Sequence, residues 1–233
     1  MYNERSILAI IPARGGSKGV PDKNIRELGG YPLLTYTIGA AKKSKYIDAV
    51  VMTTDSEKIA RVAESHGAEV PFYRPEHLAA DTSRTIDALV HAVDWLNEHG
   101  RRYDVVVLLQ PTSPLRTESE IDEAIETFFG HNELGLASVA EVIENPVLTR
   151  RLDNYGILHP ILPVCSTARR QDMPKFYHVD GAIYINKSED LTADTSLNDN
   201  PIAYVMPRMR SVDIDSLEDF YLAERYLEEL RKR

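Results

Sequence analysis

The sequence predicts an α/β protein with a doubly wound, mostly parallel sheet. Short apolar segments alternate with amphipathic ones through the first half of the chain, as expected of parallel strands covered by helices. The first apolar segment, 7–12, leads directly into a glycine-rich, cationic loop. Such loops at the carboxyl ends of parallel strands are where open α/β sheets bind their ligands.

The elements of the first half follow from hydrophobic periodicity. Strands are predicted at 7–12, 47–53, 68–72, 104–109 and 135–139, and helices at 33–44, 56–66, 85–99 and 118–129. Ser56 is the expected N-cap of its helix. The run Val-Val-Val-Leu-Leu within 104–109 is typical of a fully buried central strand.

The pattern changes near residue 145. From there to Pro174 prolines are frequent and periodicity is weak, which predicts an irregular excursion with short strands. Strand character returns at 181–186 and 203–206, and a helix is expected at 216–230 with Ser216 as its N-cap. We therefore expect one domain spanning 1–233, with an inserted irregular segment at about 145–180.

Composition limits the class of protein. The 233 residues are 43% hydrophobic, enough for a sizeable core, and the net charge of -9 argues against general binding to nucleic acid or membrane surfaces. Cys165 is the only cysteine, so an intrachain disulfide or a cysteine-based metal cluster is excluded. The chain shows no signal-peptide pattern and no long apolar run, so we expect a cytoplasmic protein.

The loop at 13–25 is the strongest candidate for a binding site. Its glycines allow the backbone to approach a ligand closely, and its N–H groups can surround an anion. Arg14, Lys18 and Lys23 can neutralise phosphate charge. The spacing matches neither a P-loop nor the dinucleotide fingerprint. A charged surface turn is the alternative, but the position after a buried strand favours a site for a nucleoside triphosphate.

A second candidate site is Asp213 and Asp215, just before the last helix. Alternating residues of an extended segment point to the same side, so both carboxylates can converge on one Mg²⁺ or Mn²⁺ ion. Asp-x-Asp alone is common, and Asp215 can instead cap the helix. The presence of a phosphate loop in the same chain makes the metal interpretation more specific.

Three further polar segments are candidate binding segments. In 109–116 two prolines fix a rigid turn, where Gln110 is placed to bind a sugar hydroxyl or carboxylate. Arg116 is expected to make a structural ion pair or to cap local carbonyl groups. The segment 74–85 suits a base edge and ribose, although a helix-capping loop explains it better when taken alone. Arg169 and Arg170 can bind an anionic second substrate, or lie in a solvated loop.

Taken together, these segments resemble the acylneuraminate cytidylyltransferases, the CMP-sialic acid synthetases. The matching motifs occur in order: Ala-Arg-Gly-Gly-Ser-Lys-Gly-Val-Pro-x-Lys-Asn at 13–24, Thr-Thr-Asp at 53–55, Leu-Gln-Pro-Thr-Ser-Pro-Leu-Arg at 109–116, Gly-Ala-Ile-Tyr-Ile-Asn at 181–186 and Asp-Ile-Asp at 213–215. The resemblance implies a Rossmann-like nucleotidyltransferase that joins CTP and a nonulosonic acid into a CMP-sugar, releasing pyrophosphate. It also implies a homodimer formed through the excursion, with Arg169 or Arg170 near the partner's sugar pocket.

The resemblance implies roles for individual residues. Arg14, Lys23 and Asp215 are the catalytic candidates. The nucleotide candidates are Ala13, Arg14, Gly15, Gly16, Ser17, Lys23, Asn24, Arg74, Asp81 and Thr85. The substrate candidates are Gln110, Arg170, His178 and Asp180, and the metal candidates are Asp213 and Asp215.

The chain departs from the sialate-specific pattern on the sugar side. A lysine that such members carry is missing from 147–149, and His178 and Asp180 stand where they have Arg and Asn. The acceptor is therefore N-acetylneuraminate or a relative such as legionaminic or pseudaminic acid. A nucleotidyltransferase for another acceptor, such as an octulosonate or a polyol phosphate, is the second alternative. A non-catalytic nucleotide-binding module is the third.

Overall fold

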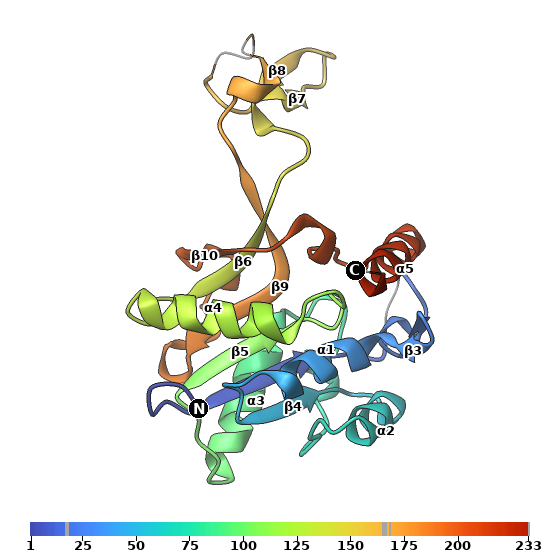
Figure 1. The fold of residues 1–233 in the computed structure, drawn as a ribbon, viewed down its shortest axis with the longest axis vertical. Helices are drawn as coiled ribbons and strands as arrows, with labels where there is room; N and C mark the ends of the chain where they lie inside the picture. The colour runs from blue at the N-terminus through green and yellow to red at the C-terminus, as the bar shows by residue number, and fades with distance from the viewer. Residues whose placement is uncertain (17–18, 165–166, 168, 233) are drawn as a thin grey trace.

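A computed structural model describes residues 1–16, 19–164, 167 and 169–232. Its main sheet has six strands in the order β10-β6-β9-β5-β1-β4 (Figure 1). Pairing is parallel for β1 with β4, β1 with β5 and β10 with β6, whereas β9 runs antiparallel to both of its neighbours. The strands are β1 (Ile7–Pro12), β4 (Ala49–Thr53), β5 (Val105–Leu109), β6 (Leu136–Glu141), β9 (Tyr177–Lys187) and β10 (Ile202–Val205).

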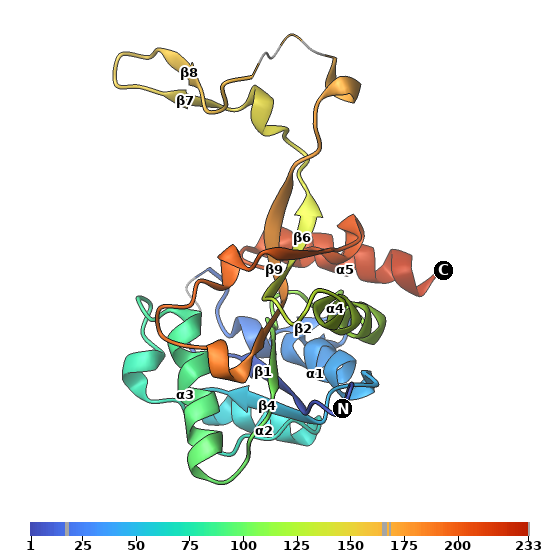
Figure 2. The same cartoon turned by 90° about the vertical axis from the view of Figure 1, so that its left-hand side faces the viewer.

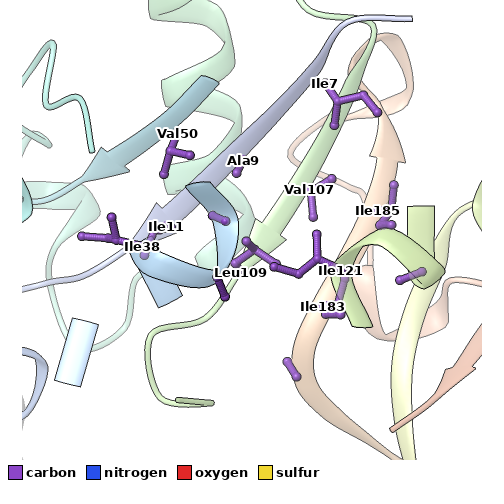
Figure 3. Packing of buried hydrophobic residues seen from close by; sticks show 14 of the residues in the cluster. Ile7, Ala9, Ile11, Ile38, Val50, Val107, Leu109, Ile121, Ile183 and Ile185 are labelled. Carbon is purple, nitrogen blue, oxygen red and sulfur yellow. The ribbon is translucent and has the colours of Figure 1, made fainter. Parts of the chain in front are cut away.

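Helices cover both faces of the sheet, which confirms the doubly wound fold (Figures 1 and 2). One face packs against α1 (Leu33–Lys43), α2 (Glu57–Ser65) and α4 (Glu118–Gly130), and the other against α3 (Thr85–Glu98). Figure 3 shows Ile38 of α1 and Ile121 of α4 against the strand residues Ile11 and Leu109. The central strands β1 and β5 are buried on both sides because each has helices above and below it.

Each face of the sheet carries one apolar cluster, and a third apolar cluster fixes the last helix, α5 (Leu217–Arg231), beside the loops that follow the strands. Phe220 and Ala223 of α5 pack with Val20, Val212 and Ile214. Ser216 caps α5 in a reciprocal capping box with Asp219, as its sequence predicts. The short antiparallel pair β2 (Glu27–Leu28) and β3 (Tyr31–Pro32) lies between the first loop and α1.

The strand predicted at 68–72 is wrong. The segment makes only isolated bridges, from Val51 to Glu69 and from Thr54 to Tyr73. Pro71 explains the difference, because a proline has no N–H to donate to a ladder beside the edge strand β4. The strand predicted at 181–186 is real but extends over Tyr177–Lys187.

The excursion predicted near 145 is an arm that projects from the body. Strands β6 and β9 form its stalk, and its end carries the hairpin of β7 (Arg150–Leu152) and β8 (Leu158–Pro160) (Figures 1 and 2). Tyr155, Leu152 and Leu158 are among its many exposed apolar side chains. Among the helices that the structure describes, none has the length and apolar character needed to span a membrane.

Candidate active site

A cleft of about 460 Å³ opens where β1 and β5 end. It is lined by residues of several loops that are far apart in the sequence. Nine of the predicted site residues lie along it: Arg14, Lys23, Asn24, Arg74, Asp81, Thr85, Gln110, Asp213 and Asp215. Most of the predicted nucleotide residues, one predicted acceptor residue and both predicted metal residues thus share one cavity.

Backbone contacts hold the start of the glycine-rich loop at the mouth of the cleft. The N–H of Ala13 donates to the carbonyl of Thr53 (3.0 Å), which extends the β1–β4 pairing by one residue. The N–H of Gly15 then donates to Asp55 (2.9 Å), and the Asn24 amide donates to the carbonyl of Arg14 (3.0 Å). Gly16 lies next in this loop, whereas Ser17 and Lys18 fall outside the described residues.

Arg14 lies along one wall of the cleft. Its Nη1 donates to a carboxylate oxygen of Asp81 (2.9 Å) and, at 3.4 Å, to the carbonyl of Ala79. Both side chains are partly exposed, so the pair is screened by solvent and fixes orientation more than it adds stability. The guanidinium is therefore held at the cleft with access to an incoming anion.

Lys23 joins the glycine-rich loop to the Asp-x-Asp segment. Its ammonium group donates to the carbonyl of Ile214 (2.7 Å) and to Asp215 (3.0 Å). A Cβ on Gly19 would collide with the carbonyl oxygen of Asp215, so only glycine allows this approach. The Ile214 N–H donates to the carbonyl of Thr112 (2.9 Å), which ties the same segment to the loop after β5.

Asp213 and Asp215 both line the cleft, as their alternation predicts. The Asp213 carboxylate is accessible from the cleft but closely surrounded by protein atoms, and this burial raises its pKa. A hydrogen bond from Thr112 opposes the shift, and the negative charge of Asp215 adds to it. Two hard oxygen donors that repel each other are a suitable partial ligand set for a divalent cation.

Arg74 is a buried cation at the back of the cleft. Its Nη2 donates to the carbonyl of Thr53 (2.6 Å) and its Nε to the Thr53 hydroxyl (3.2 Å). Burial lowers the pKa of Arg74 to about 10, while the nearby Asp55 raises it. The side chain stays charged at neutral pH and is rigidly oriented, which suits recognition of a polar base edge.

The predicted substrate residues are only partly brought together. Gln110 lines the cleft, and His178 is exposed on the β9 stalk. Asp180 lies beneath the surface, where it accepts hydrogen bonds from the Ser138 hydroxyl and the Ala182 N–H. Burial raises the pKa of Asp180, and the Ser138 bond opposes that shift. A direct contact between Asp180 and a sugar stays a prediction.

Arg170 opens the short 3₁₀ turn η4 (Arg170–Asp172) in the arm, so its backbone lies with β7 and β8 beyond the body that carries the cleft (Figure 1). The position of its side chain lies outside the described part of the structure. Within one chain, the predicted Arg170 contact is thus separated from Gln110.

Comparison with known proteins decides the family. Residues 8–154 match the cytidylyltransferase family. The chain belongs to it. A CMP-N,N'-diacetyllegionaminic acid synthase from Legionella pneumophila is 36% identical over 95% of this chain and 96% of that protein. A pseudaminic acid cytidylyltransferase from Campylobacter jejuni is 33% identical over 93% and 94%. The N-acylneuraminate cytidylyltransferase of Escherichia coli is 38% identical over 93% of this chain, which spans only 51% of that protein.

Solved structures show the same fold at low sequence identity. CMP:2-keto-3-deoxy-manno-octonic acid synthetase complexed with CTP superposes with a TM-score of 0.70 at 14% identity, covering 96% of this chain and 99% of that one. A 4-diphosphocytidyl-2C-methyl-D-erythritol synthase gives 0.68 at 15% identity with the same coverage. This cytidylyltransferase therefore has the Rossmann-like nucleotidyltransferase fold that its sequence predicts.

Sequence reasoning missed several residues of the cytidylyltransferase cleft. Gly19 and Thr112 line it, and both contact the Asp-x-Asp segment through backbone or side-chain atoms. Asp55 orients the glycine-rich loop, whereas the sequence indicates it only as part of the Thr-Thr-Asp motif. Contacts of this kind join distant loops, so no local pattern in the sequence indicates them.

Proposed function

We propose that this cytidylyltransferase transfers CMP from CTP to a nonulosonic acid. The observation that carries the proposal is the convergence of the Arg14–Lys23 loop, Arg74, Gln110 and the Asp-x-Asp segment on one cleft. Relatives that match nearly the whole chain are named as synthases of CMP-legionaminic acid or cytidylyltransferases of pseudaminic acid and N-acylneuraminate. Because CTP is an intracellular nucleotide, we place the reaction in the cytoplasm.

The chemistry requires positioning and charge neutralisation rather than a covalent nucleophile. The anomeric hydroxyl of the acceptor attacks the α-phosphorus of CTP in line. The bond from that phosphorus to the oxygen shared with the β-phosphate breaks, and pyrophosphate leaves while the hydroxyl proton passes to solvent. Arg14 and Lys23 bind the phosphates, and Arg74, Asp81 and Thr85 orient the cytidine.

The Asp213 and Asp215 carboxylates fit a Mg²⁺ or Mn²⁺ ion. Both are hard oxygen donors on one cleft wall, next to the residues proposed for the triphosphate. Such an ion would stabilise the charge that develops on the phosphate oxygens during transfer. Lys23, already bonded to Asp215, holds this carboxylate at the junction of the two loops.

We propose that two copies form a C₂ homodimer through the arm. The arm at about 145–180 exposes Leu152, Tyr155, Ile157, Leu158 and Ile161, which is more apolar surface than a monomer commonly leaves uncovered. The arm also carries Arg169 and Arg170 away from the cleft of their own chain (Figure 1). In a symmetric pair these arginines would serve the partner's acceptor pocket, where a carboxylate favours bidentate arginine.

A diamino nonulosonic acid is the second candidate acceptor. His178 and Asp180 replace the arginine and asparagine of the sialate-specific pattern, so this side of the pocket is less cationic. In addition, the chain matches the legionaminic and pseudaminic relatives over nearly their full length. We expect measurable activity on a 5,7-diamido nonulosonate, to be compared with that on N-acetylneuraminate.

The test measures kcat/KM for pyrophosphate release at fixed CTP and Mg²⁺, with N-acetylneuraminate, legionaminate, pseudaminate and an octulosonate as acceptors. A nonulosonate should be the best acceptor. Octulosonate as the best acceptor would exclude the proposal. A strong preference for N-acetylneuraminate that Asp180→Asn leaves unchanged would show that these departures do not set specificity.

A further inference from the structure

The antiparallel strand β9 contains a bulge directly beside the cleft. Ala137 of β6 pairs with Tyr184, but Val139 pairs with Val179, so residues 180–183 lie opposite Ser138 without regular β6 partners. Gly181, within this bulge, has a φ of 77°, which strongly favours glycine. On its other side Ile183 pairs with Leu109 of β5, immediately before Gln110. Bulges next to active sites often redirect a side chain.

Three buried polar side chains satisfy the backbone of the bulge. Ser138 accepts from the Ile183 N–H (2.8 Å), and Asp180 accepts from the Ala182 N–H (3.1 Å). Arg116, only 2% exposed, donates from Nη1 to the Ala182 carbonyl (2.6 Å). These bonds replace ladder hydrogen bonds, because buried backbone groups are costly when unpaired. A buried cation and a buried carboxylate thus lie on the two sides of Ala182.

The same guanidinium also contacts the acceptor side of the cleft. Arg116 Nη1 donates, at 3.4 Å, to the carbonyl of Gln110. The Gln110 side chain lies against the bulge, since a Cβ on Gly181 would be 3.3 Å from Oε1 of Gln110. The Thr112 hydroxyl donates to the same oxygen (3.4 Å). Arg116 therefore fixes the backbone of both segments that determine where the Gln110 amide points.

We propose that Arg116 is a positioning residue that sets the orientation of Gln110 by holding the β9 bulge against it. The inference rests on the proposed function, because the acceptor that Gln110 would bind is that of the proposed reaction. Arg116 itself is buried and does not line the cleft, so it would act through other residues. Its effect on catalysis should pass through Gln110 and concern the acceptor rather than CTP.

The test is a double-mutant cycle on Gln110→Ala combined with Arg116→Lys or with Gly181→Ala. Lysine keeps the charge but loses the fork of donors, and alanine places a methyl group against Gln110. Arg116→Lys and Gly181→Ala should each, as a single change, raise the acceptor KM about tenfold and leave the KM for CTP within about twofold. In the Gln110→Ala background the same change should have less than about a twofold further effect.

Arg210→Lys is the matched control. Arg210 binds the start of α4, donating to Thr117 and Glu120, and among the described residues it makes no hydrogen bond to Gln110. This variant should lower stability without changing the acceptor KM. Circular dichroism and thermal melts on every variant separate misfolding from displacement of the Gln110 amide. Ser138→Ala is a further variant, which loosens the bulge without altering Arg116 or Gly181.

A readout without substrate keeps this inference separate from the proposed function. The side-chain amide signals of Gln110 in proton–nitrogen correlation spectra are assigned by their loss in Gln110→Ala. They should shift in Arg116→Lys and Gly181→Ala but not in Arg210→Lys. Unchanged signals, or kinetic effects that multiply with Gln110→Ala, would overturn the positioning role. Absence of any CMP-sugar from the wild type would instead reject the proposed function.

Discussion

At the scale of single residues, the site depends on contacts between loops that are distant in the sequence. Lys23 is the clearest case, because its ammonium bonds with Ile214 and Asp215 join the first loop to the last one. Its side chain is only 13% exposed, whereas that of Asp215 is 79% exposed. The lysine is thus held in place while the carboxylate remains accessible from the cleft.

Replacing Asp215 by asparagine tests the proposed metal site. Asp215→Asn keeps the shape and the Ser216 cap of α5 but removes one hard anionic donor. We expect kcat to fall by at least about 10²-fold at saturating Mg²⁺, because transition-state charge is no longer stabilised. Steady-state pyrophosphate release measures this, with Asp219→Asn as a control for helix capping. A near-normal kcat would reject the metal assignment.

Arg14→Ala and Lys23→Ala test the phosphate contacts. Both side chains lie at the cleft and outside the three apolar clusters, so the fold should survive. We expect kcat/KM for CTP to fall by about 10²-fold or more in each variant, because each loses one positive charge that neutralises the phosphates. Circular dichroism checks folding. Normal use of CTP by both variants would mean that the loop is structural.

At the scale of elements, hydrophobic periodicity predicted most helices and strands, and residue type predicted two helix caps. Ser56 and Ser216 cap α2 and α5 as expected, because capping depends on residues three positions apart. Pro71 disrupts the segment 68–72, for which the sequence predicts a strand. The full length of β9 and its bulge could not be predicted, since they depend on pairing with β5 and β6, far away in the sequence.

The same limit applies to the candidate site. Arg14, Lys23 and the two aspartates of the Asp-x-Asp segment were found because their motifs are local. The burial of Asp180 beneath the cleft and its bond to Ser138 were not, because Ser138 lies on another strand. Arg116 was expected to make an ion pair or to cap carbonyl groups, and it binds the carbonyls of Gln110 and Ala182. The bulge that makes this contact important is a tertiary feature.

His91 on α3 should make the fold sensitive to acid. Burial lowers its pKa from the usual 6.5, and the positive charges of Arg74 and His77 add to this, against Asp94 and Glu98. The His91 imidazole is therefore protonated more readily in the unfolded chain than in the native state, so stability falls as pH drops below 6.5. His91→Phe preserves the ring contact with Phe72 and removes the titration.

We expect the melting temperature of His91→Phe minus that of the wild type to be larger at about pH 5.5 than at about pH 7.5. Calorimetry at the two pH values measures the difference. An equal offset at both values would show that His91 does not contribute to acid sensitivity.

At the scale of the whole molecule, the arm is the feature that a single copy does not explain. Leu152 and Leu158 face each other across the β7–β8 hairpin, and each is 63% exposed. A small two-stranded hairpin with an apolar surface needs a partner for stability. The proposed dimer provides that partner and brings Arg169 and Arg170 toward a second cleft.

Changing both leucines to lysine should abolish the proposed dimer. The charges are tolerated on an exposed hairpin but not within an apolar interface. Light scattering at micromolar concentration should give a dimer mass for wild type and a monomer mass for Leu152→Lys/Leu158→Lys. Leu134→Lys, at an exposed leucine of the body, is the control and should remain dimeric. A monomeric wild type would contradict the assembly.

The most direct test of the central claim follows CTP by phosphorus NMR in the presence of Mg²⁺ and a nonulosonic acid. We predict that the triphosphate signals are replaced by one phosphodiester signal and by pyrophosphate, in equal amounts, only when the acceptor is present. The Lys23→Ala protein should slow this conversion strongly. Formation of CDP and inorganic phosphate, or release of pyrophosphate at the same rate without acceptor, would contradict the assignment of this cleft to CMP transfer.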